Sequence, residues 1–336
     1  MRIGIDNYSA HHLELAGIAL LQHAQTFGLG GVQFDNYRQV TPRLDRAEAA
    51  EVRDYAIANG LYLEGGMPCP NPHRPGPLAL RDGDGDFRRG LRRHLEGLAE
   101  VVVGSRAVRC FVGGPGDRTR GAPWQQQLAD TAQVVRELSP LLRDLGLKLA
   151  FENHADATVD ELIRMIEDVG DDVMGICLDT GNLVITLDDP LESGRRAAPY
   201  TAATQIKDGI VVFDDEGLVF NPRPLGEGMV PLEAILAEVA RFHPEVLLSI
   251  EDHGRLFPIP IFDDEFMATF DRLTPTQLAH IVRLARECEA RIARGEVPSP
   301  AEVEAVPWPD RADERMRRGA RHLQQIVDRL PAVAAA

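Results

Sequence analysis

The feature of this sequence that most constrains its fold is an alternation of apolar, strand-like runs with amphipathic, helix-like runs. Strands are predicted at residues 2–6, 30–34, 61–65, 107–112, 147–152 and 174–179, and two more end near Lys207 and Glu251. Helices are predicted at residues 10–27, 44–59, 87–103, 123–145, 158–169 and 231–242, and the helix between the sixth and seventh strands is poorly marked. Eight such units indicate a parallel sheet closed into a barrel, because uniformly apolar strands suit a sheet covered on both faces.

The predicted barrel takes up residues 1–272, and residues 273–336 are predicted to be a C-terminal helical extension packed on it, with helices at about 276–294 and 312–330. The fold class is therefore α/β, a (β/α)8 TIM barrel with extra C-terminal helices. The segment 67–85 is rich in Pro and Gly and is predicted to be a loop, and residues 331–336 a frayed tail. Two apolar loops, 212–223 and 254–270, are predicted to form a lid or a partner surface, with core packing as the alternative.

Composition argues against several classes of protein. The 336 residues carry a formal net charge of −16, which disfavours a nucleic-acid binder, since such proteins usually present a basic face. The four cysteines lack CxxC spacing and are expected to be free thiols in a reducing cytosol. We see no signal peptide and no apolar run long enough to cross a bilayer, so a cytoplasmic protein is expected.

Acidic and amide side chains stand at the ends of four successive predicted strands. Glu152, Asp179, Gln205 and Glu251 close the fifth to eighth strands. In a parallel barrel these carboxyl ends converge on one mouth, where the chemistry of such barrels is usually found. Three carboxylates and an amide oxygen suit a hard divalent ion, most simply Mn²⁺, with Mg²⁺, Co²⁺ or Zn²⁺ as alternatives. Any one of these acids alone would more often cap a helix or pair with a surface cation, so the metal hypothesis rests on the succession of four.

A divalent ion with an open position could hold neighbouring sugar oxygens and stabilise the enediolate formed when a proton leaves the carbon next to a carbonyl. The candidates for proton transfer are Glu152 and Glu251 first, then His154 and His253. Side-chain alternation places each histidine on the same side of its strand as the glutamate two residues before it. For His154 a role that only supports a metal ligand is nearly as plausible as the role of base. Lys207 is a candidate partner for the developing oxyanion.

Further candidates would bind the substrate rather than the metal. They are His253 and Asn182, and also Asp35 and Glu64 at the ends of earlier predicted strands, for which turn and cap duty is the competing interpretation.

Five segments, FENH at 151–154, LDTGN at 178–182, QIKDG at 205–209, PLGEG at 224–228 and SIEDH at 249–253, resemble the xylose isomerase-like TIM barrels, a superfamily of sugar-phosphate isomerases and epimerases. The resemblance covers roughly the first 270 residues. It implies a metal held by Glu152, Asp179 and Glu251. The family normally has His where this chain has Gln205, and its epimerases have a second His where this chain has Asn182, so both positions depart from the pattern.

One branch of the superfamily, the α subunits of C-glycoside deglycosidases, is similar in size. Membership would imply elimination of the aglycone from an oxidised, 3-keto C-glycoside, with His154 suited to the base and a small β subunit as partner. If the chain is not of that branch, the resemblance implies an isomerase or epimerase that acts on a small sugar or keto-sugar. Such an enzyme is expected to be a homo-oligomer, without nucleic-acid or membrane partners. Two other functions are weighed against this one. A metal-dependent nuclease of the same fold would need a His-rich site, and a sugar-binding or scaffold subunit would need no metal.

Overall fold

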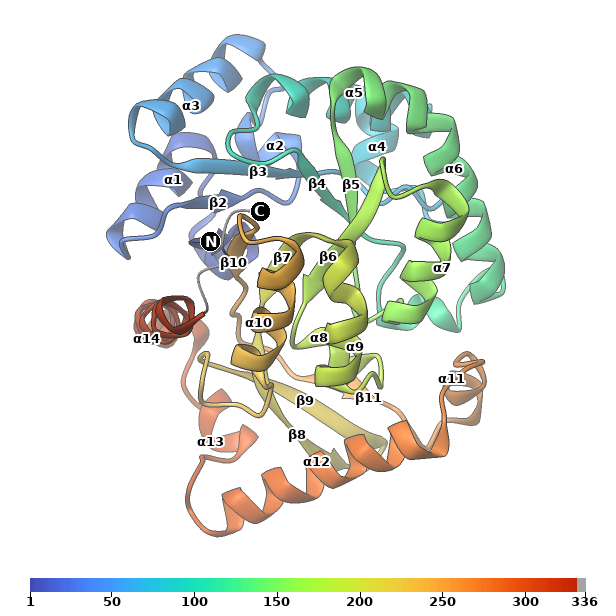
Figure 1. Cartoon of the computed structure of the whole chain (residues 1–336), viewed down its shortest axis with the longest axis vertical. Helices are drawn as coiled ribbons and strands as arrows, with labels where there is room; N and C mark the ends of the chain where they lie inside the picture. The colour runs from blue at the N-terminus through green and yellow to red at the C-terminus, as the bar shows by residue number, and fades with distance from the viewer. Residues whose placement is uncertain (331–336) are drawn as a thin grey trace.

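The computed structural model describes residues 1–330, and the predicted frayed tail, 331–336, lies outside the described residues. The eight predicted strands form a closed parallel barrel, which confirms the fold class (Figure 1). The barrel strands are β1 (Arg2–Asp6), β2 (Gly31–Gln33), β3 (Tyr62–Gly66), β4 (Ala107–Cys110), β5 (Lys148–Glu152), β6 (Met174–Asp179), β7 (Thr201–Ile206) and β10 (Leu247–Ile250). Neighbours around the barrel follow chain order, and β10 pairs with β1 to close it.

Helices pack around this barrel as the alternation predicts. They are α1 (Gly17–Thr26), α2 (Tyr37–Val40), α3 (Arg46–Ala58), α4 (Pro77–Asp82), α5 (Phe87–Val101), α6 (Trp124–Leu145), α7 (Val159–Val169), α8 (Asn182–Ile185), α9 (Pro190–Ala197) and α10 (Leu232–Phe242). The apolar face of each long helix lies against the strands; on α7, for example, Leu162, Met165 and Ile166 are buried. The same helix starts at a capping box, in which the Thr158 hydroxyl accepts from the Glu161 N–H and the Glu161 carboxylate accepts from the Thr158 N–H.

Three predictions about helices need correction. The helix predicted over 10–27 is interrupted, because Glu14 and Gly17 adopt positive φ angles of 52° and 51° between the 3₁₀ segment η1 (Asn7–Leu13) and α1. Gly17 also lies where a Cβ would come within 2.9 Å of the Val40 carbonyl oxygen, so the chain turns where only glycine fits easily.

The predicted loop 67–85 contains α4, which begins at Pro77. The poorly marked connection between the sixth and seventh strands contains two short helices, α8 and α9.

The predicted lid is largely a small sheet. Residues 208–223 form an antiparallel hairpin of β8 (Asp208–Asp214) and β9 (Gly217–Arg223), and β11 (Phe257–Ile259) adds a third strand beside β9. Phe220, Phe257 and Ile259 are buried in an apolar cluster with α12 (Pro275–Ala293), so core packing explains most of these apolar residues. Leu256 and Phe262 are exceptions, with 43% and 66% of their surface exposed. The second predicted loop also contains the short helix α11 (Asp264–Ala268).

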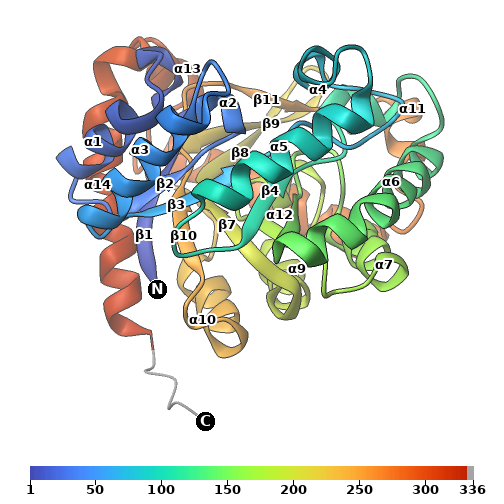
Figure 2. The ribbon, with the colours of Figure 1, turned by 90° about the horizontal axis from the view of Figure 1, so that it is seen from above.

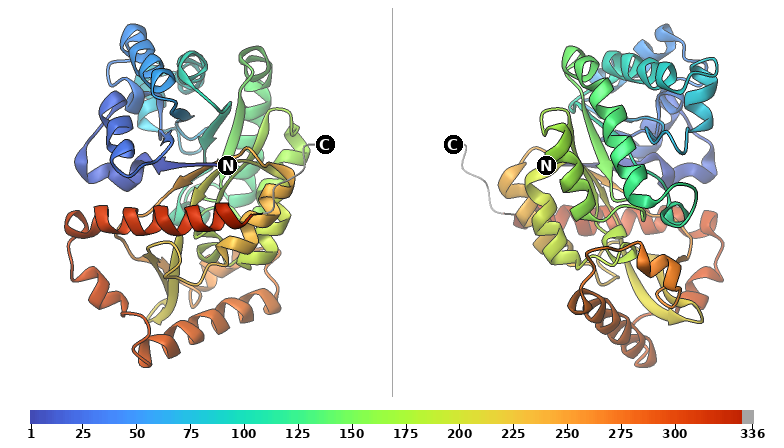
Figure 3. Two further views of the ribbon diagram at one scale, coloured as in Figure 1. Left: turned by 60° about the vertical axis from the view of Figure 1, so that its left-hand side comes forward. Right: turned by 90° about the vertical axis from the view of Figure 1, so that its right-hand side faces the viewer.

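The C-terminal helices lie against both the barrel and the hairpin. Beyond α12 come α13 (Pro300–Glu304) and the long α14 (Trp308–Arg329). Helix α12 packs on β8, and α14 packs on β1, β10 and η1, so the end of the chain covers the strands that close the barrel (Figure 2). Figure 3 shows α12 and α14 joined through α13, with the hairpin between them. Among residues 1–330, every helix is too short or too polar to span a bilayer.

Candidate metal centre and active site

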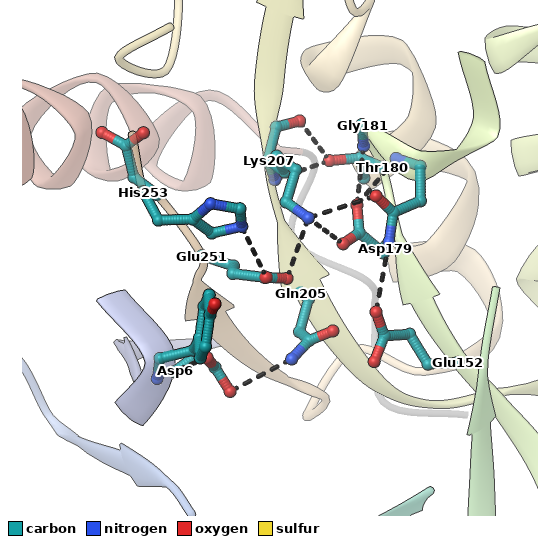
Figure 4. Close-up of polar contacts among 12 residues, drawn as sticks. Asp6, Glu152, Asp179, Thr180, Gly181, Gln205, Lys207, Glu251 and His253 are labelled. Carbon is teal, nitrogen blue, oxygen red and sulfur yellow. Dashed lines mark hydrogen bonds and ion pairs between the residues drawn. The ribbon is translucent and has the colours of Figure 1, made fainter. Parts of the chain in front are cut away.

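Three carboxylates meet at the carboxyl end of the barrel. One oxygen each from Glu152, Asp179 and Glu251 lies within 4.8 Å of the other two, and all three side chains are buried. The register explains the meeting, because Asp179 pairs with Gln205 on the next strand and the Glu251 N–H donates to the Ile206 carbonyl oxygen of β7. Strand ends that are neighbours in the barrel therefore project their acids toward one point (Figure 4).

Two cations of the chain neutralise part of this charge. Lys207 Nζ lies 2.8 Å from Asp179 Oδ2 and 3.2 Å from Glu251 Oε2 (Figure 4). The guanidinium of Arg109, on β4, pairs with Glu152, to which its Nε donates at 2.6 Å, and it also pairs with Asp35. Both cations are almost fully buried, so these ion pairs lie in surroundings where unpaired charge is costly.

The pKa values of the three carboxylates are pushed apart. Burial raises the pKa of Glu152 to about 7, against the opposing charge of Arg109. Burial also raises the pKa of Asp179 well above its usual range, although Lys207 opposes it. For Glu251 burial is outweighed by the Lys207 ammonium and by the bond to His253, and its pKa is held well below the usual value. Neighbouring carboxylates in one buried cluster cannot all be charged without further positive charge.

Gln205 turns its amide toward the same cluster. Its Nε2 donates to Asp6 Oδ2 at 3.0 Å, which fixes the orientation of the amide (Figure 4). The carbonyl Oε1 is buried and accepts no hydrogen bond from the described residues. An amide oxygen left in this way is free to bind a cation, as the sequence predicts for this position.

Two histidines flank the carboxylates. Nδ1 of His154 lies 3.0 Å from the Gly113 carbonyl oxygen, and the ring stacks on Phe111 with a centroid distance of 4.4 Å. Since a carbonyl oxygen only accepts, Nδ1 carries the proton and Nε2 keeps its lone pair. His253 Nε2 donates to Glu251 Oε1 at 3.1 Å. Burial lowers the pKa of both rings, so each is neutral near pH 7.

Above the cluster lies a cavity of about 270 Å³, large enough for a monosaccharide. Its walls include the aromatic residues Tyr8, Phe111 and Phe257. Six of the predicted site residues also line it, namely Asp35, His154, Asn182, Lys207, Glu251 and His253. A mouth of this kind, apolar on one side with a few converging polar groups, is typical of a small-molecule site.

The donor set fits a hard divalent ion. Gln205 Oε1 is buried without a hydrogen-bond partner within residues 1–330, and Asp179 Oδ2 and Glu251 Oε2 are buried oxygens that have the Lys207 ammonium beside them but no hydrogen bond of regular geometry. Oxygen donors of this kind are those that Mn²⁺, Mg²⁺ and related ions prefer. The acidic cluster could thus hold a metal, and Lys207 would share Asp179 and Glu251 with it.

The structure brings together most of the residues predicted from the sequence, but not all of them. Asn182 joins the cluster, because its Nδ2 donates to Glu152 Oε1 at 3.1 Å and its Oδ1 accepts from Lys207 Nζ at 3.2 Å. Glu64 lies apart from the cavity, fully buried on β3, and accepts from Gln33 Nε2 at 2.9 Å. Sequence reasoning missed Arg109. The available signal was a lone Arg inside an apolar strand, since a charged residue at a buried strand position needs a partner.

Comparison with known proteins agrees with the fold. Residues 21–268 match the family of xylose isomerase-like TIM barrels. The chain belongs to this family. A curated relative, the uncharacterized protein YihM of Escherichia coli K12, is 25% identical over 112 residues, which span 33% of the chain and 33% of that relative.

Among solved structures, the 3-keto-D-glucoside 4-epimerase of E. coli is 16% identical to this chain, with a TM-score of 0.55. The match covers 84% of this chain and 99% of the epimerase. The IolI protein with a bound zinc atom is 15% identical with a TM-score of 0.55, over 89% of this chain and 100% of that one. At these identities the likeness shows the fold, and what the two proteins act on or bind is a property of each of them.

Proposed function

We propose that this family member is a divalent-metal-dependent enzyme of the isomerase or epimerase type, which removes a proton from the carbon next to a sugar carbonyl. The observation that carries the proposal is the meeting of Glu152, Asp179 and Glu251 beneath a cavity of monosaccharide size. The sugar epimerase and the zinc-bound protein of the same fold support it by analogy.

The residues that would hold the ion are Glu152, Asp179, Glu251 and the amide oxygen of Gln205. Mn²⁺ is the proposed ion, because the donors are oxygens and the set lacks a thiolate. When bound, the ion would supply Lewis-acid polarisation of a sugar carbonyl.

His154 is the proposed base. Its Nδ1 is engaged by the Gly113 carbonyl, so the lone pair of Nε2 is available in a ring that lines the cavity. The alternatives are less available, since Glu152 is held by Arg109 and Asn182, and Glu251 contacts Lys207 and His253. Phe111, stacked on the imidazole, keeps the plane of the ring fixed.

Lys207 is the proposed electrostatic partner of the oxyanion that develops on the substrate. Its ammonium group lines the cavity and also contacts Asp179 and Glu251, which hold it in place. A preorganised cation in a buried site stabilises developing negative charge more strongly than one in water does.

Elimination of an aglycone from a 3-keto C-glycoside is the second candidate. It begins with the same proton removal, and the aromatic wall of Tyr8, Phe111 and Phe257 would suit an aromatic leaving group. The two reactions are distinguished by their products, a changed sugar in one case and a released aglycone in the other.

Solvent isotope exchange tests the proposal. The Mn²⁺-loaded enzyme is incubated in D₂O with a panel of ketoses and 3-keto-glucosides, and deuterium at the carbon next to the carbonyl is followed by NMR. We expect incorporation with at least one sugar, and a loss of roughly 10²–10⁴-fold in rate for His154→Ala with the metal still bound. His23→Ala, on α1 and away from the cavity, is the matched control and should exchange like the wild type.

Two results would contradict this proposal. If no sugar of the panel takes up deuterium on the metal-loaded enzyme, the proton-removal chemistry is wrong. If His154→Ala exchanges at the wild-type rate, the base is another residue, and Glu152 or Glu251 is next to be tested.

A further inference from the structure

A second cavity lies outside the barrel mouth, between the hairpin and the C-terminal helices. It measures about 580 Å³ and is lined from β9, α12, α13, α14 and the segments that connect them. Figure 3 shows these elements on one side of the molecule. Within the described residues, it shares no lining residue with the cavity above the carboxylates.

Five arginines line this second cavity, although the chain as a whole has a net charge of −16. They are Arg223, Arg291, Arg311, Arg315 and Arg318. Three of them sit on α14 at a spacing of four and three residues, which places them on one face of that helix. Two acids, Glu227 and Glu296, are the only carboxylates among the described lining residues.

Arg223 is the arginine that most needs a partner. Arg223 is 3% exposed, and its Nη2 donates to the Pro298 carbonyl oxygen at 2.9 Å. Its Nε and Nη1 are buried and have no hydrogen-bond partner among residues 1–330. Burial, together with the charges of Arg315 and Arg311 and against that of Glu304, lowers the pKa of Arg223 to about 10. Buried guanidinium nitrogens without a hydrogen-bond acceptor are costly, so their retention calls for a ligand.

Arg311 supplies further free donors beside it. Its Nη2 pairs with Glu304 at 2.7 Å, while Nε and Nη1 have no partner in the described part of the chain. Two guanidiniums thus present four nitrogens without acceptors. Each Nε carries one N–H and each Nη1 carries two, which together exceed the roughly four acceptor sites of a carboxylate. A phosphate group has three non-bridging oxygens, each able to accept more than one bond, and suits such a set better.

We infer that this cavity, here called the arginine pocket, binds the phosphate group of a small molecule through Arg223 and Arg311. Val297, Val303 and Val306 form an apolar part of the wall, which leaves room for the carbon skeleton of a phosphate ester. The site is separate from the proposed sugar site and does not depend on the proposed function.

Calorimetric titration with inorganic phosphate tests the inference, at an ionic strength held constant with NaCl. Wild-type protein should bind phosphate saturably. Arg223→Met should weaken that binding by roughly 10- to 100-fold, the usual effect of removing a charged hydrogen-bonding partner. Arg143→Met is the matched control, since Arg143 lies on α6, is half exposed and pairs with Asp172 outside the pocket. It should bind phosphate like the wild type.

A parallel titration with a hexose phosphate identifies the source of the anion. Tighter binding of the ester than of phosphate assigns the pocket to a phosphorylated metabolite, and equal binding assigns it to free phosphate; both support the inference. Arg311→Met, tested beside Arg223→Met with circular dichroism as a check of folding, keeps the test valid if one variant does not fold.

Crystals soaked in tungstate locate the anion by its anomalous signal, which should lie between Arg223 and Arg311. The inference is overturned if wild-type protein shows no saturable binding of either compound, if both folded arginine variants bind phosphate as tightly as the wild type, or if tungstate occupies only the cavity beside Lys207.

Discussion

At the scale of single residues, the carboxylates of the barrel show how burial sets chemistry. Glu64 is the clearest case, because it is fully buried on β3 and its Oε1 accepts no hydrogen bond from the described residues. Burial raises its pKa to about 7, from a usual value of 4.5. The folded protein therefore holds this proton more tightly than the unfolded chain does.

This shift gives a stability prediction with a definite sign. Between pH 4.5 and 7 the folded state keeps a proton that the unfolded state has lost, so Glu64 makes the free energy of unfolding fall as pH rises through that window. Glu64→Gln removes this dependence and should be more stable than the wild type at pH 8, by about 3 kcal/mol at most. Urea denaturation of both proteins at pH 5 and pH 8 measures the difference. If the free energies of unfolding of the variant and the wild type differ by the same amount at pH 5 and pH 8, Glu64 is not the group responsible.

The residue scale also shows where sequence reasoning ends. Glu152, Asp179 and Glu251 could be predicted to converge, because each closes a strand and parallel strands share one mouth. The pairing of Arg109 with Glu152 could not, since it joins residues 43 positions apart through side chains whose rotamers the strand pattern leaves open. That Oε1 of Gln205 lacks a hydrogen-bond partner among the described residues could not be predicted either. It depends on the orientation of the amide, which the bond to Asp6 fixes.

At the scale of elements, a buried ion pair joins α14 to the end of β10. Arg315 donates to Asp252 through Nε at 2.8 Å and Nη2 at 2.6 Å, and both side chains are at most 5% exposed. Asp252 lies between Glu251 and His253, so this pair fixes the segment that carries two of the proposed site residues. The C-terminal extension thus supports the site although it contributes no residue to its cavity among those described.

Arg315→Met should destabilise the protein by about 3–5 kcal/mol, because it leaves the Asp252 carboxylate buried without its partner. Asp252→Asn in the same background should recover part of that loss. Arg318→Met, which removes a half-exposed pair with Glu227, is the control and should cost about 1 kcal/mol or less. Chemical denaturation measures all three. A cost for Arg315→Met no larger than that for Arg318→Met would mean that the pair does not hold the helix.

The elements themselves were predictable to different degrees. Strands such as β6, predicted as 174–179, are local apolar runs whose ends follow from composition alone. The β8–β9 hairpin pairs locally, Asp214 with Gly217, but its strands are buried on both faces and lack the alternation of apolar and polar residues that marks a strand. Strand β11 pairs with β9 through Phe257 and Phe220, which lie far apart in the chain. Pairing over such a distance leaves no local period to detect.

At the scale of the whole molecule, the site exists only once the barrel is closed. The bond from Gln205 to Asp6 joins residues 199 positions apart, and β10 must pair with β1 to bring Glu251 beside them. An ion that binds here binds only the native state and therefore stabilises it. At a free ion concentration of 100 times the dissociation constant, it should add about 2.7 kcal/mol to the free energy of unfolding.

Metal content after dialysis tests the central claim most directly. Protein is equilibrated with Mn²⁺, dialysed against metal-free buffer and analysed by inductively coupled plasma mass spectrometry. We predict about one ion per wild-type chain and almost none in the double variant Glu152→Gln, Glu251→Gln. The exposed pair Glu137→Gln, Glu233→Gln changes the charge by the same amount and should keep the ion. Full occupancy in the first double variant, or a wild type that retains no Mn²⁺ and shows no binding on titration, would contradict the account.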